Sequence, residues 1–168
     1  MKLLYLDCVG GISGDMLLGA LIDLGLDLKA LRHELAKLGL DEFEVTARRG
    51  ERQAITGTKF EVAVHEHDHH HHHHDEHEHH GRSFSDIKRL IESSKLAAEV
   101  KQHAIGAFRR LATAEGKIHG VAPEKVHFHE VGAVDSIVDF VGACIGLQKL
   151  GVERCCGSLR RSLARCQR

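Results

Sequence analysis

The spacing of hydrophobic residues along the chain predicts a mixed α/β protein. Short apolar or alternating runs indicate strands near residues 2–7, 43–49, 58–64 and 125–130. Apolar residues that recur every three or four positions indicate helices at 14–24, 28–38, 86–93, 95–119 and 134–150. We therefore expect an α/β fold in which one small mixed sheet is covered by four or five helices.

Local signals add detail to these elements. Ser13 and Asp27 are expected to cap the first two helices. The first strand is an apolar run and should be buried, whereas the strands at 43–49 and 58–64 should form a hairpin with a long loop from Gly50 to Gly57. The apolar stripe of the longest helix begins at Leu96 and ends at Ile118. The helix at 134–150 is apolar on nearly every side and should lie in the core.

A low-complexity segment divides the chain. Residues 1–64 and 83–154 are expected to be two parts of one α/β domain, and residues 65–82 a disordered His-rich loop between them. Residues 155–168 contain four Arg, three Cys and no acid, without a clear period. We interpret this stretch as an atypical basic tail that should pack poorly and that resembles a chain translated out of its native frame.

The composition excludes several classes of protein. The 168 residues include 42% hydrophobic and only 4% aromatic residues, so the core should be aliphatic. A formal net charge of −1 gives no reason to expect nucleic-acid or membrane binding. Five Cys without a CxxC pair favour neither a zinc ribbon nor a disulfide framework. The short apolar run at the N-terminus is broken by Asp7 and lacks the length and the cleavage site expected of a signal peptide. A cytoplasmic location is expected.

The His-rich segment is suited to binding metal ions. Imidazole is a good ligand for Ni, Zn and Cu, and the order of divalent affinities favours Ni and Cu over Mn and Fe. A purification tag would be terminal and free of acids, whereas this tract is internal and contains five acidic residues, so we favour native metal buffering. The expected ligands are His65, His67, His69, His70, His71, His72, His73, His74, His77, His79 and His80.

A glycine-rich loop follows the first strand. Gly10, Gly11, Ser13 and Gly14 stand between that strand and the first helix, where backbone N–H groups can bind a phosphate. The sequence is neither a Walker motif nor a GxGxxG fingerprint, so a close-packed turn explains it equally well. Asp7 and Asp15 flank the loop, and a cation would be needed between such carboxylates and a phosphate.

The stretch at 126–139 concentrates the polar chemistry of the chain. His127 and His129 should share one face of a strand, with Glu130 on the other. Asp135 and Asp139 are four residues apart on the apolar helix and must be paired, hydrogen-bonded or bound to metal. Any one of these residues could be satisfied within the core, but together they indicate a functional site.

Three segments together resemble a known family. They are residues 5–16, the His tract, and the stretch from His127 to Asp139. They are similar to the N-terminal part of the LarC family of nickel-insertion proteins, which are CTP-dependent nickel chelatases. The resemblance implies insertion of Ni(II) into pyridinium-3,5-bisthiocarboxylic acid mononucleotide, giving the nickel-pincer nucleotide cofactor of lactate racemase.

The resemblance also implies roles for individual residues. His127, His129, Glu130 and Asp135 are candidate metal ligands, and the Gly10–Gly14 loop is a candidate binding site for the substrate's phosphate. The candidate catalytic carboxylates are Asp7, Asp15 and Asp135, with Asp135 or Asp7 as the base that removes a ring proton. CTP, with Mg or Mn, is expected to bind to the second half of a full-length member, outside this chain. That half is an expected partner in a larger oligomer.

Two other functions remain open. The chain could be a nickel-storage protein or metallochaperone without catalysis, in which the His tract is the function. It could also be a metal-dependent phosphohydrolase built on Asp7, Asp15, His127, His129 and Asp135. For an enzyme, we expect the glycine-rich turn and the double-His segment to meet across a shared cavity.

Overall fold

Five α-helices are the largest elements in the described part of the chain. The computed structural model describes residues 1–8, 10–41, 43–52, 54–65, 81–128 and 131–157. Within them lie α1 (Gly14–Asp23), α2 (Leu28–Leu35), α3 (Phe84–Ser93), α4 (Ala98–His119) and α5 (Val134–Lys149). Two 3-10 turns follow α2 and α4, at Ala36–Leu38 and Pro123–Lys125. The α/β class and the helices are confirmed.

The described strands form three separate pairs. β1 (Leu3–Leu6) pairs in parallel with β6 (Arg154–Gly157), and β2 (Phe43–Arg52) pairs antiparallel with β3 (Ile55–Val64). The third pair is β4 (Arg82–Ser83) with β5 (His127–Phe128). The prediction of one mixed sheet is therefore wrong for the described residues. Alternating hydrophobic residues indicate that one face of a strand is buried, but they do not indicate what it is buried against. In this fold the neighbours are helices and not further strands.

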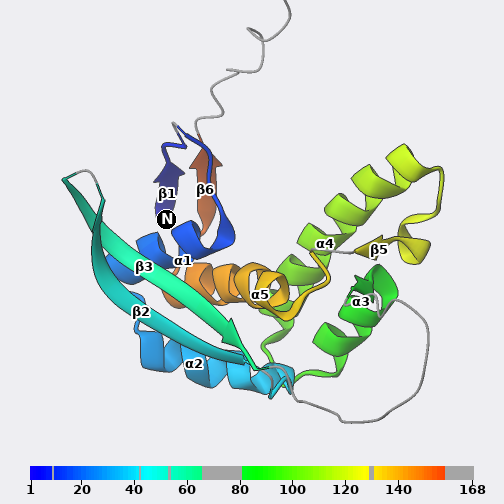
Figure 1. Ribbon diagram of the computed structural model, residues 1–168, viewed down its shortest axis with the longest axis horizontal. Coiled ribbons are helices and arrows are strands. Elements are labelled where there is room, and N and C mark those ends of the chain that lie inside the picture. Colours follow the sequence, from blue (N-terminus) through cyan, green and yellow to red (C-terminus); the bar gives the residue numbers. More distant parts are fainter. Residues whose placement is uncertain (9, 42, 53, 66–80, 129–130, 158–168) are drawn as a thin grey trace, which may run out of the picture.

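Helix α5 runs through the centre of the molecule, with α1 and α2 on one side and α4 on the other (Figure 1). Its Gly142 and Gly146 lie against the side chains of Leu18 and Leu21 on α1. A β-carbon at Gly146 would be only 2.8 Å from Leu21 Cδ1, so the small residues allow the two helices to approach closely. The predicted burial of this helix is confirmed, and it fixes the start of α1 beside the start of α5.

Helix α4 buries the predicted stripe as far as Phe108 and departs from it in its second half. Its buried residues recur every four positions from Val100 to Gly116. Ile118, the predicted end of the stripe, is 80% exposed because the last turn projects beyond the core. Phe108, in the middle of the helix, stacks on Phe140 of α5 with ring centroids 4.5 Å apart. This contact joins the second half of the chain to the central helix.

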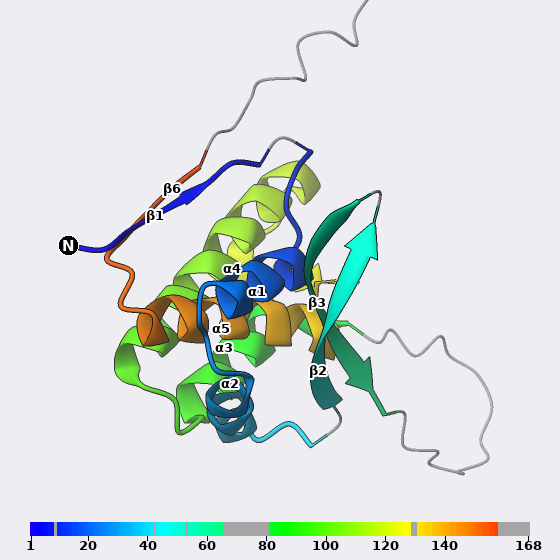
Figure 2. The same cartoon turned by 90° about the vertical axis from the view of Figure 1, so that its left-hand side faces the viewer.

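The β2–β3 hairpin is longer than predicted and lies across α1 (Figure 2). Its strands pair from Phe43 opposite Val64 to Arg52 opposite Ile55, so Gly50 and Gly57 face each other within the ladder. The expected eight-residue loop is wrong, because glycines can occupy strand positions as well as turns. Thr58 anchors the hairpin to α1 by donating its N–H and hydroxyl to the Asp23 carboxylate, at 3.1 and 2.7 Å.

The β1–β6 ribbon stands at the edge of the molecule (Figures 1 and 2). Leu3 and Tyr5 are 53% and 61% exposed, so the prediction of a buried first strand is wrong. The partner strand includes residues 155–157, where the poorly packing tail was predicted to begin; these residues pair with β1 but remain exposed. The apolar run at Leu3–Leu6 thus forms a strand, but this strand is not buried on both faces.

Several predictions fall outside the described residues. They concern the disorder of the His tract from 66 to 80, the positions of His129 and Glu130, and the tail from 158 onward. The helices in the described part of the chain do not combine the length and the apolar composition needed to cross a membrane.

Candidate functional site

Three carboxylates gather where α1 and α5 begin. Asp15 lies in the first turn of α1, Asp135 in the first turn of α5, and Asp139 one turn further along α5. The two helices meet at Gly14, where an added β-carbon would lie 2.4 Å from both Cβ and Oδ2 of Asp139. Only glycine leaves room for that carboxylate, so the glycine-rich segment and the central stretch are in direct contact.

Asp139 has the most perturbed carboxyl group of the three. Burial, together with the smaller effect of the negative charges of Asp15 and Asp135, raises its pKa to about 6. The backbone N–H of Asp15 donates to the carboxylate and partly offsets this shift. Oδ1 of Asp139 is buried and has no hydrogen-bond partner among the described residues. This group can therefore hold or release a proton close to neutral pH.

The other two carboxylates are held by local hydrogen bonds. Oδ1 of Asp15 accepts from the Met16 N–H at 2.8 Å and from the Ser13 hydroxyl. Oδ1 of Asp135 accepts from the Ser136 N–H at 2.7 Å, and this side chain is exposed. Ser13 occupies the predicted N-cap position, but its hydroxyl is used by Asp15 and makes no cap bond. Within the cluster, Asp135 is therefore exposed to solvent, whereas Asp139 is partly buried.

The glycine-rich loop divides into two parts. Gly10 and Gly11 border open space, and Gly11 has the left-handed φ of 98° that suits a tight turn. Gly14 instead packs against Asp139. The close-packed turn therefore explains Gly14, while the phosphate-binding role of Gly10, Gly11 and Ser13 stays a prediction. An anion bound there would approach three carboxylates and would need a cation beside it.

His127 lies in a different environment, on β5 beside β4. Its ring packs close to Gly81, where an added β-carbon would be 2.8 Å from Cε1. The Ser83 hydroxyl, which donates to Asp86 at 2.6 Å, lowers the pKa of Asp86, and the nearby charge of His127 lowers it slightly more. Neither His127 nor Asp7 is among the groups that perturb Asp139.

The expected shared cavity is not one of the two main cavities in the described part of the chain. One cavity of about 590 Å³ lies between α4, α5 and β6, and another of about 330 Å³ lies beside Arg32 and Phe43. Neither is lined by Asp7, His127 or Asp135. The structure thus brings Asp15, Asp135 and Asp139 together and does not join them to His127 through either cavity.

The predicted metal ligands are only partly described. Among residues with a described position, no three His, Cys, Asp or Glu lie close enough to hold a metal ion. The proposed sets depend on His129, Glu130 and most of the His tract, which are outside that part. Within the tract only His65 is described, and it is exposed. The metal assignments stay predictions.

Asp139 was not among the predicted catalytic residues. The available signal was its spacing of four residues from Asp135 on a helix that is apolar elsewhere. What singles it out is contact with α1, because Gly14 and Asp15 are distant in sequence and close to Asp139 only in the fold.

Comparison with known proteins gives a consistent picture. The family model described as nickel insertion protein matches residues 4–161. A protein of Desulfitobacterium hafniense named pyridinium-3,5-bisthiocarboxylic acid mononucleotide nickel insertion protein is 49% identical over 154 residues, covering 92% of this chain and 36% of the relative. Relatives from Syntrophobacter fumaroxidans and Citrifermentans bemidjiense are also named as nickel insertion proteins.

The relative from Syntrophobacter fumaroxidans is 46% identical, and the match covers 94% of this chain and 38% of the relative. The relative from Citrifermentans bemidjiense is 50% identical, and the match covers 91% of this chain and 37% of the relative. The chain thus spans a little over a third of the length of the curated relatives that it matches. No solved structure matches it. Since the family model covers nearly the whole chain and the identity approaches one half, the chain belongs to the nickel insertion protein family.

Proposed function

We propose that this chain supplies part of an enzyme that inserts Ni(II) into pyridinium-3,5-bisthiocarboxylic acid mononucleotide. The observation that carries the proposal is the 49% identity, over 92% of the chain, with a relative that is named for this reaction. Nickel is a substrate in this proposal, because it is transferred to the mononucleotide. The product would be the nickel-pincer nucleotide of lactate racemase, as the resemblance implies.

The carboxylate cluster provides a chemical role that fits this proposal. Metal insertion at a ring carbon releases a proton, and a base with a pKa near the working pH removes it most effectively. Asp139, whose pKa is raised to about 6, meets this requirement. Asp135 is exposed beside it and Asp15 helps to set its charge, so both remain candidates. Asp7 remains a candidate from sequence alone.

Nickel delivery is assigned to the imidazole groups. The His tract would raise the local concentration of Ni(II), and His127, His129 and Glu130 would bind it before transfer. Asp135, which lies in the carboxylate cluster, would receive the ion there. A divalent-metal phosphohydrolase, the third possibility, gains no support from the arrangement, because His127 lies beside Asp86 and not among the other carboxylates.

The complete reaction is assigned to a larger assembly. The relatives are almost three times as long as the matched part, and CTP with Mg or Mn is proposed to bind in the remainder of a relative's chain. The test is nickel incorporation into the mononucleotide with the full chain, CTP and a co-expressed polypeptide that represents this remainder. Asp139→Asn should lower incorporation at least about tenfold. Asp41→Asn, which changes an exposed carboxylate between α2 and β2, should not.

Nickel storage without catalysis is the second candidate, because eleven His fall within residues 65–80. Deleting this segment separates the two functions. An enzyme should retain one tight nickel per chain, and this nickel should be lost when His127 and His129 are also replaced by Ala. A storage protein should lose nearly all nickel with the deletion alone. Equilibrium dialysis with Ni(II) measures both outcomes.

A further inference from the structure

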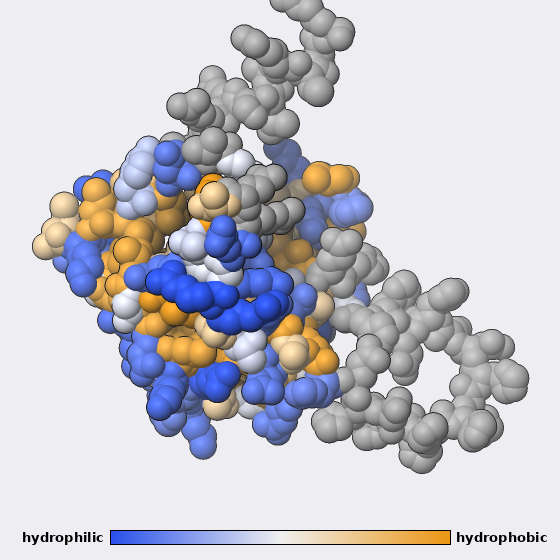
Figure 3. Space-filling view, turned by 60° about the vertical axis from the view of Figure 1, so that its left-hand side comes forward, coloured by the Kyte–Doolittle hydropathy of each residue, from blue (hydrophilic) through white to orange (hydrophobic). Residues whose placement is uncertain are grey.

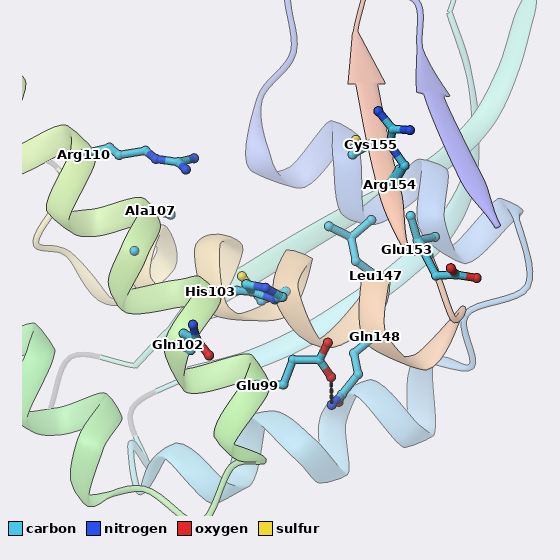
Figure 4. Close-up of a pocket in the computed structure, with 13 residues that line it drawn as sticks. Glu99, Gln102, His103, Ala107, Arg110, Leu147, Gln148, Glu153, Arg154 and Cys155 are labelled. Atoms are coloured by element: carbon cyan, nitrogen blue, oxygen red, sulfur yellow. Dashed lines mark hydrogen bonds between the residues drawn. The ribbon is translucent and has the colours of Figure 1, made fainter. Parts of the chain in front are cut away.

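A groove separates α4 from the β1–β6 ribbon. Its volume is about 590 Å³. His103, Ala107 and Arg110 of α4 form one wall, Leu147 of α5 lies at its floor, and Cys155 of β6 faces it from the other side (Figure 4). The wall on α4 also includes Gly106, which has no atom within 4 Å of the position of an added β-carbon. The groove is therefore open along the helix.

The second edge of β6 faces this groove. Among the described residues the sheet has the order β1–β6, so β6 is paired on one side only. Figure 4 shows β6 between β1 and the groove, with α4 beyond. A strand added beside β6 would occupy the space between β6 and α4, with α5 beneath it.

An isolated two-stranded parallel sheet is unusual in a folded protein. Parallel sheets are normally covered on both faces and contain more than two strands, because short isolated pairs are marginally stable. Here Leu3 and Tyr5 remain largely exposed, and every residue of β6 is exposed. Figure 3 shows that the face of the molecule turned toward the viewer carries hydrophobic patches beside a strongly hydrophilic band. The ribbon has the backbone groups and apolar surface that a further strand would use.

We propose that a β-strand from the remaining part of the family polypeptide adds to the free edge of β6 and fills the groove against α4. The choice of this partner rests on the proposed function and on the lengths of the relatives, of which the matched part covers 36–38%. Main-chain hydrogen bonds would provide the affinity. The small side chains at Gly106 and Ala107 would give the new strand room beside the helix.

The test uses the full 168-residue chain, co-expressed with a tagged polypeptide comprising the part of the Desulfitobacterium hafniense relative outside the match. The two should co-purify without nickel or CTP. Gly106→Trp places a large side chain in the groove, from a position where an added β-carbon has no other atom within 4 Å, and should lower the affinity roughly tenfold or more. Ala114→Trp, an exposed position on α4 outside the groove, is the matched control and should bind normally.

Hydrogen exchange of the wild-type complex gives a second readout that does not depend on the folding of a variant. Strand addition should slow exchange of the amides at 154–157 roughly tenfold or more. Four results would overturn the proposal: no complex with the wild-type chain, equal affinity of Gly106→Trp, unprotected β6 amides, or a homodimer of the chain that Gly106→Trp abolishes. A complex that forms but does not insert nickel would contradict the proposed function alone.

Discussion

At the scale of single residues, Asp139 combines the properties that favour a chemical role. Its carboxyl group is partly buried, carries one oxygen without a described partner, and lies beside two other carboxylates. A purely structural carboxylate in this position would be expected to have a cationic partner or a full set of hydrogen bonds. Asp23, which receives two hydrogen bonds from Thr58 and pairs with Arg49 at 2.9 Å, shows what such a structural carboxylate looks like in this fold.

The raised pKa of Asp139 makes stability depend on pH. Between about pH 4 and 6 the folded protein holds a proton that the unfolded chain has released, because the pKa is about 6 in the fold and 3.8 without it. The free energy of unfolding should therefore fall as pH rises through this window. Asp139→Asn should flatten that dependence and, at pH 7.5, stabilise the fold by about 1 kcal/mol, since solvent screens part of the effect.

Urea unfolding of both proteins at several pH values between 4 and 8 measures this difference. Parallel stability curves for the wild type and Asp139→Asn would show that the carboxyl group is not perturbed by the fold.

Gly14 is the residue that permits this arrangement. A β-carbon there would overlap Asp139, so Gly14→Ala should destabilise the fold by about 1–3 kcal/mol and displace the carboxylate. Gly106→Ala is the matched control, because nothing lies within 4 Å of its added β-carbon and alanine favours a helix by roughly 0.5–1 kcal/mol. Thermal unfolding compares the two; equal effects would mean that the Gly14–Asp139 contact is not formed.

At the scale of elements, the hairpin and the helices were predicted with different success. Helix positions agreed closely because a period of 3.6 residues and capping residues such as Asp27 and Ser83 act locally. The hairpin was found but its turn was misplaced, because Gly50 and Gly57 resembled loop boundaries and instead pair with each other. Its turn contains Ala54, whose φ is 62°.

This left-handed backbone predicts a stabilising substitution. Ala54→Gly should raise the free energy of unfolding by roughly 0.5–1 kcal/mol, because glycine adopts a positive φ without the steric cost that alanine carries. The same change at Ala63, within β3 and opposite Glu44, should lower stability by a similar amount. Chemical unfolding distinguishes them. A loss of stability in Ala54→Gly would contradict the turn geometry.

At the scale of the whole molecule, the segments before and after the His tract share one core. Helices α1 and α2 and strand β3, from the first segment, pack against α5 from the second. Their contacts include Leu18 and Leu21 against the glycines of α5. The predicted division into two parts of one domain therefore leads to a testable consequence.

Cleavage within the tract should leave the two segments associated. A protease site inserted between residues 70 and 75 can be cut after folding, and the fragments should co-elute in size-exclusion chromatography under native conditions and separate in urea. The same site placed after residue 157 provides a control for the cleavage itself. Separation of the tract-cut fragments without denaturant would mean that each segment folds independently.

The sequence by itself determined the helices, the α/β class, the central position of α5 and the family, because these depend on local periodicity and on motifs within short segments. It did not determine which strands pair, that the first strand is exposed, or that Asp139 rather than His127 lies beside Asp15 of α1. Those facts depend on contacts between residues far apart in the chain, such as Leu3 with Arg154 and Gly14 with Asp139. Hydrophobic spacing indicates that a residue will be buried, whereas only the packed structure shows which neighbour it is buried against.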